Sequence, residues 1–184
     1  MSEKPSYLGL LNAISLGESE AECYLNAWAE ATHDDGVRKV IATVALREGE
    51  HGKAFAKRVC ELGYAVLPRD NSQAAAKMAI ASSRDLTDRE KFEKLDLASI
   101  QDSSNDDVFT RMFADKNIDI QTGALLGRYI AEERDSGRML RACYAQLCAQ
   151  ENGNGQSSVG VDGRVADSLT RIECLLEQLV ARQS

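Results

Sequence analysis

The stretch LREGEHGKAF, from Leu46 to Phe55, places charged residues where the surrounding pattern requires apolar ones. On both sides of it, apolar residues recur at helical spacing, and they are Val37, Ile41, Val44, Phe55, Val59 and Leu62. Continuing this stripe through the stretch puts Glu48 and His51 on the inner face of the helix. An ionised carboxylate in an apolar interior is costly unless it is paired, protonated or bound to a metal. The pattern therefore predicts a helix over 37–62 with a polar centre on its inner face.

Length, composition and charge define a soluble globular class. The chain has 184 residues, 43% of them apolar and 28% charged, which suits one domain with a core plus a tail. Its net charge of −7 argues against a general nucleic-acid or anionic-membrane surface. The uncharged run from Tyr7 to Gly17 is too short to span a bilayer. We predict a cytoplasmic protein with neither nucleic acid nor membrane as a partner.

The five cysteines indicate neither a zinc ribbon nor a disulfide framework. Their number is odd, and the sequence contains no C-x-x-C pair. Reduced thiols in the cytoplasm are the simpler interpretation.

Three further amphipathic segments repeat the design of the central stretch. A helix over 6–33 carries Glu18 in its apolar stripe, and a helix over 120–150 carries Glu133 in the same way. The sequence TDRE, from Thr87 to Glu90, is typical of a capping box that begins another helix. The inner stripe of that helix is apolar at both ends and acidic in the middle, and it comprises Phe92, Leu95, Ser99, Asp102, Asp106, Phe109 and Phe113.

These segments predict an all-α fold, an antiparallel four-helix bundle over residues 1–150. The connection over 64–85 is long enough to cross the bundle from end to end and contains a short helical pattern, SQAAAKMAIASS. Residues 151–160, ENGNGQSSVG, have the composition of a flexible linker. Residues 161–184 follow with a heptad-spaced apolar edge, which predicts an additional C-terminal helix that docks on its own bundle, on a second chain or on a partner protein.

The two halves of the predicted bundle resemble each other. A shift of 85 residues aligns Glu48 with Glu133, and it then places Ser136 opposite His51 and Ser103 opposite Glu18. The repeat is weak in identity but consistent in its stripe of inward positions.

Glu48 and His51 lie three residues apart, so both side chains leave one face of a helix and can meet one ion. Carboxylate and imidazole ligands suit iron, manganese or zinc better than calcium. The sequences LGESEAECY and REGEHGKAF resemble the ferritin-like superfamily and, within it, the rubrerythrin group, over about residues 7–150. That resemblance implies a centre of one or two iron ions in a four-helix bundle, with these residues as ligands: Glu18, Glu48, His51 and Glu133, with Asp102 and Asp106 in place of a third-helix glutamate.

The chain departs from the family pattern in its second half. Ser136 stands where the resemblance requires a second histidine, and Ser103 stands where it requires the third-helix glutamate. The C-x-x-C pairs of a rubrerythrin electron-transfer domain are missing, so turnover would need an external electron donor. We therefore expect metal nearer to one ion per chain than two.

The sequence is compatible with three functions, and each candidate site residue also has an interpretation without a functional role. The first is a rubrerythrin-like oxidoreductase acting on dioxygen or peroxide, the second a metal-binding protein without turnover, and the third a bundle with a decayed site that serves as an interaction module. A homo-oligomer such as a dimer is expected in each case. A Glu-x-x-His pair can also be a solvated helix face, and QDSSNDD can be a helix break facing water. His33 is interpreted as a surface residue, and Tyr24 and Tyr129 as core aromatics with hydroxyls tied to the polar centre.

Overall fold

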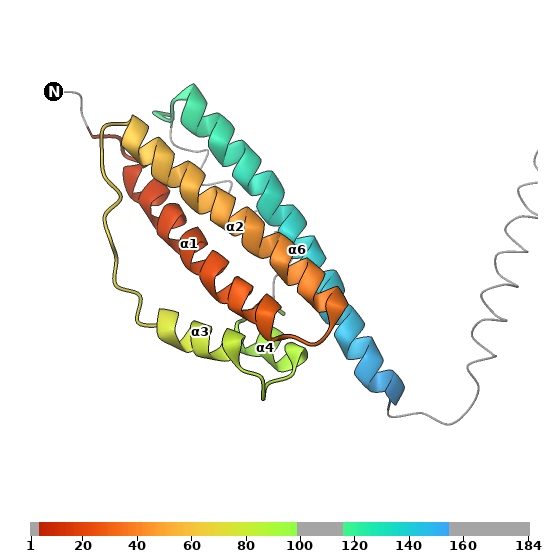
Figure 1. The fold of residues 1–184 in the computed structure, drawn as a ribbon. Coiled ribbons are helices and arrows are strands. Elements are labelled where there is room, and N and C mark those ends of the chain that lie inside the picture. Colours follow the sequence, from red (N-terminus) through yellow and green to blue (C-terminus); the bar gives the residue numbers. More distant parts are fainter. Residues whose placement is uncertain (1–3, 99–115, 155–184) are drawn as a thin grey trace, which may run out of the picture. The chain divides into compact units, whose positions relative to one another are not determined.

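The computed structural model describes residues 4–98 and 116–154, without the side chains of 151–154, and this part of the chain is all-α (Figure 1). Its helices are α1 (Leu8–Ala31), α2 (Asp35–Glu61), α3 (Ala74–Ser82), α4 (Asp88–Lys94) and α6 (Ile120–Asn154). The predicted all-α class is therefore confirmed. The chain divides into two units, Met1–Cys148 and Ala149–Ser184.

A tight turn joins α1 to α2 and makes them antiparallel. The side chain of Asp34 caps α2 by accepting hydrogen bonds from the backbone amides of Gly36 and Val37. At the other end of α2, Gly63 has a φ of 85°, the left-handed conformation that glycine adopts readily after a helix. Both ends agree with the predicted helix to within a few residues.

The segment after α2 runs back along α1. The amide of Asn12 exchanges two hydrogen bonds with the backbone of Leu67. Further along, Asn71 donates to Glu20, and Lys77 on α3 lies 3.6 Å from the same carboxylate. This segment starts near the beginning of α1 and reaches its second half (Figure 1).

Helix α4 is anchored to the end of α1 by a half-buried carboxylate. Asp88 accepts one hydrogen bond from the indole Nε1 of Trp28 and one from the hydroxyl of Thr32, both at 2.6 Å. The predicted capping box is present, because Thr87 and Glu90 each bind the backbone amide of the other. These contacts hold the start of α4 against the end of α1.

The long helix predicted to begin at Thr87 is interrupted. Helix α4 ends at Lys94, and Asp96 has a φ of 58°, a left-handed conformation that a continuing α-helix does not contain. Asp102 and Asp106 lie outside the described residues. Their placement at the site stays a prediction.

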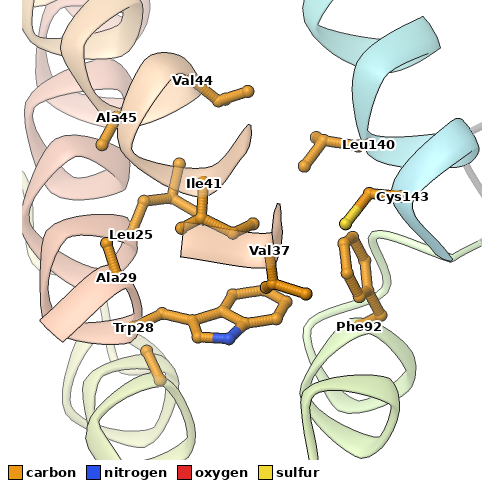
Figure 2. Close-up of a cluster of buried hydrophobic side chains, with 11 residues drawn as sticks. Leu25, Trp28, Ala29, Val37, Ile41, Val44, Ala45, Phe92, Leu140 and Cys143 are labelled. Carbon is orange, nitrogen blue, oxygen red and sulfur yellow. The ribbon is translucent and has the colours of Figure 1, made fainter. Parts of the chain in front are cut away.

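The core of the first unit consists of two apolar clusters. One lies around the end of α1 and the start of α2, and Figure 2 shows it closing onto Phe92, Leu140 and Cys143. Its members are Leu25, Trp28, Ala29, Val37, Ile41, Val44, Ala45, Ala81, Phe92, Leu140 and Cys143. The other lies at the opposite ends of the same helices and comprises Tyr7, Leu8, Leu11, Ile14, Phe55, Val59, Leu126, Tyr129 and Ile130.

Helices α1, α2 and α6 each pass from one cluster to the other. On α1 the gap between the clusters falls between Ile14 and Leu25, and on α2 it falls between Ala45 and Phe55. On α6, residue 130 belongs to one cluster and residue 140 to the other. The polar positions singled out on these three helices, Glu18, Glu48, His51 and Glu133, fall in these gaps.

Helix α6 continues to Asn154, into the segment predicted as a linker. The remainder of that linker and the predicted C-terminal helix lie outside the described residues. Within the part of the chain that the structure describes, no helix has both the length and the apolar character needed to cross a membrane.

Candidate metal centre

Four side chains from three helices meet between the two apolar clusters. Glu18 comes from α1, Glu48 and His51 from α2, and Glu133 from α6, and one ligand atom of each lies within 4.8 Å of the others. Glu48 and His51 are only 6% and 3% exposed. The structure therefore brings together the four ligands predicted from these helices, in a cluster that could hold a metal ion.

Two glycines of the central stretch let α1 approach α2 closely at this level. A Cβ atom at Gly49 would overlap the carboxylate of Glu22, and one at Gly52 would overlap the hydroxyl of Ser19. The buried hydroxyl of Ser15 donates to the carbonyl of Gly52 across the same contact, at 3.0 Å. Close approach brings Glu18 within reach of the α2 ligands. Glycine inside a helix normally costs stability, so its repetition beside Glu48 and His51 was a detectable signal that the sequence analysis did not use.

The imidazole of His51 is oriented by a carboxylate on its outer side. Its Nε2 atom lies 2.7 Å from Oε2 of Glu132. An ionised carboxylate only accepts hydrogen bonds, so Nε2 carries the proton in this contact. In the neutral ring the lone pair then belongs to Nδ1, which faces Glu133 at 3.3 Å and Glu48 at 3.8 Å. An outer carboxylate of this kind is the usual support of a metal-ligating histidine.

Two buried polar atoms in the cluster have no hydrogen-bond partner. They are Nδ1 of His51 and Oε1 of Glu133, which lie opposite each other. Buried polar atoms are almost always satisfied, and those that are not require an explanation. An ion bound between them would satisfy both, so the residues present fit a metal ion.

The pKa values in the cluster indicate that keeping all three carboxylates ionised is unfavourable without a cation. Burial, contact with Glu48 and the negative charge of Glu133 raise the pKa of Glu18 to about 9. Burial also raises the pKa of Glu133. For His51, burial disfavours the imidazolium, but the carboxylates of Glu133, Glu48 and Glu132 outweigh it and raise the pKa to about 10. Burial opposes ionisation of Glu48 as well, yet its interactions with His51 and Glu18 lower its pKa. Protons held by Glu18 and His51 therefore offset the negative charge of the cluster when no cation is bound.

Two tyrosines border the cluster, as the sequence analysis expected. The hydroxyl of Tyr129 donates to Oε1 of Glu18 at 2.7 Å, and its ring meets the ring of His51 edge to face at a centroid distance of 5.0 Å. Burial and the carboxylates of Glu18 and Glu133 raise its pKa. Burial and the charges of Glu48 and Glu18 raise the pKa of Tyr24 to about 12. Both hydroxyls remain protonated at neutral pH, and that of Tyr129 serves as a donor to a ligand.

The position that corresponds to His51 in the internal repeat is Ser136, which contacts an arginine. Ser136 is buried, with 2% of its surface exposed, and its hydroxyl accepts a hydrogen bond of 3.3 Å from the guanidinium of Arg47. The same guanidinium lies 2.8 Å from the carboxylate of Asp135 and 3.7 Å from the sulfur of Met139. An arginine of α2 thus covers one turn of α6 where a second imidazole would stand.

The roles of Glu132 and Arg47 were not predicted from the sequence. Glu132 precedes Glu133 and was not assigned to the inner stripe, and Arg47 precedes Glu48 in the same way. Both lie on flanks of their helices where α2 faces α6. His33, the other histidine, is exposed at the end of α1, as expected.

Comparison with protein-family models, curated proteins and solved structures gives no match for this chain.

Proposed function

We propose that this chain is a ferritin-like, rubrerythrin-related metal-binding protein that holds iron, or alternatively manganese or zinc, at Glu18, Glu48, His51 and Glu133. The observation that carries the proposal is that Nδ1 of His51 and Oε1 of Glu133 face each other at 3.3 Å, buried and without a hydrogen bond, within a cluster of four ligand atoms. Three long helices with a polar centre between two apolar clusters, and a long connection that runs along α1, support the ferritin-like assignment.

Each of the four side chains has a defined part in binding. The three carboxylates offset the charge of a divalent ion, and the imidazole supplies a nitrogen ligand. Glu132 holds the imidazole by Nε2, while Tyr129 holds Glu18 through its hydroxyl. Apolar side chains on both sides limit the access of water and strengthen these interactions.

We further propose that the bound ion reacts with dioxygen or peroxide, with electrons from an external donor. Iron would supply the one-electron chemistry. The electrons would come from outside, because the sequence contains no C-x-x-C pair. Ser136 and Arg47 favour an alternative, in which the protein binds metal without turnover, because the second half of the ligand set is replaced. Peroxide-dependent oxidation of bound ferrous ion would support the first function, and its absence would support the second.

The metal content of the purified protein tests the proposal. Iron, manganese and zinc are measured in protein purified aerobically without added metal, for the parent and for His51→Ala. His33→Ala is the matched control, because it removes the exposed histidine and leaves the cluster intact. We expect His51→Ala to lose metal while its far-ultraviolet helical signal stays close to that of the parent. Equal metal content in the parent and both variants would refute the assignment of His51, and metal-free parent protein that binds no added ion would refute the site.

A further inference from the structure

Arg47 lies in the first half of the internal repeat, and its guanidinium contacts Ser136 in the second half. In the first half, Glu48 is followed three residues later by His51, and in the second half Glu133 is followed three residues later by Ser136. Residues three apart on a helix share a face and lie about 5–6 Å apart, so Ser136 belongs to the neighbourhood of Glu133. Its near-complete burial agrees with that position.

A serine hydroxyl does not replace an imidazole as a metal ligand, but it accepts hydrogen bonds well. Here it accepts one from Arg47, whose side chain is 27% exposed and whose other terminal nitrogen pairs with Asp135. The thioether sulfur of Met139 lies 3.7 Å from the nitrogen that donates to Ser136. An imidazole at residue 136 would extend into the volume that the guanidinium occupies.

Arginine keeps its positive charge at every physiological pH. A fixed cation held at Ser136, three residues from Glu133, competes with any second metal ion for the same region of negative charge. The arrangement thus removes a nitrogen ligand and adds a repelling charge at the same place.

We propose that Arg47 restricts the centre to a single metal ion, by holding a permanent positive charge against Ser136 where a second Glu-x-x-His ligand pair would have to form. This inference rests on the proposed metal-binding function and adds the reason for its stoichiometry. Arg47 acts as a specificity-determining residue that does not itself contact the ion.

The test compares four proteins by equilibrium dialysis of the metal-free form against ferrous ion under nitrogen, with iron per chain as the readout. Arg47→Met removes the charge and keeps an unbranched apolar stem beside Met139. It leaves no carboxylate alone, because Arg138 also donates to Asp135 at 2.9 Å. The parent, Ser136→His, the double variant Arg47→Met/Ser136→His and the control Arg47→Lys/Ser136→His are compared, each checked for an unchanged helical signal.

We expect about one ion per chain for the parent, for Ser136→His alone and for the lysine control, and about two ions for the methionine double variant. The lysine control separates charge from shape, because it loses the guanidinium fork but keeps a cation. A second ion in Ser136→His alone, or in the lysine control, would overturn the proposal. So would a folded methionine double variant that still binds about one ion. A parent that binds none would instead overturn the metal-binding function itself.

Discussion

Binding of a divalent ion at the cluster should release about two protons at pH 7. Burial and neighbouring carboxylates raise the pKa of Glu18 to about 9. Although burial opposes the imidazolium, the surrounding carboxylates raise the pKa of His51 to about 10. Both groups therefore hold a proton in the metal-free protein at neutral pH, and both must lose it to act as ligands.

The cost of this deprotonation follows from the two pKa values. Each unit between a pKa and the ambient pH corresponds to about 1.4 kcal/mol, so the deprotonation of Glu18 and His51 together opposes binding by several kcal/mol at pH 7. That cost falls by roughly 2.7 kcal/mol for each unit of pH rise while both groups remain protonated, which makes the apparent affinity about a hundredfold higher per unit.

Titration calorimetry with manganous ion measures both quantities. Repeating the titration at pH 7 in buffers of different ionisation enthalpy gives the number of protons released, and repeating it across about one pH unit gives the slope of the affinity. Glu18→Gln is the matched variant, because it keeps the shape and removes one titrating group; it should release about one proton and bind more weakly. An affinity independent of pH in the parent, or an equal proton count in Glu18→Gln, would refute the assignment of these protonated ligands.

Glu132→Gln should weaken metal binding by about tenfold, because it removes the charge that supports the imidazole of His51. Glu50→Gln is the control, since both carboxylates bind Arg128 but, of the two, only Glu132 contacts the histidine. The metal-free fold should lose thermal stability between pH 7 and 9, because the folded-state pKa values of Glu18 and His51 lie above their ordinary values and the unfolded chain has already released both protons. Glu18→Gln should flatten that loss, and a pH-independent Tm in the parent would contradict the shifts. Truncation at Gly153 should lower the number of chains per particle measured by light scattering, and an unchanged number of chains would rule out a role of the tail in self-association.

Much of the fold was predictable from the period of its apolar residues. The stripes of 6–33, 37–62 and 120–150 identify three long helices, because a helix with one apolar face has to bury that face. The same stripes place Glu18, Glu48, His51 and Glu133 at inward positions, since each replaces an apolar residue that the period requires. A short-range rule also predicted the capping box at Thr87, where the relevant contacts lie within a few residues.

The sequence by itself thus determined which face of each helix is buried and which polar residues share it. Only the tertiary structure decided which flanks of α2 and α6 meet, and so paired Glu132 with His51 and Arg47 with Ser136. The periodicity of one helix fixes the direction of its own side chains, but it carries no information on the rotation and offset of its neighbour. The same limit applies to Asp96, whose left-handed backbone ends α4 inside a stripe that the period alone would continue.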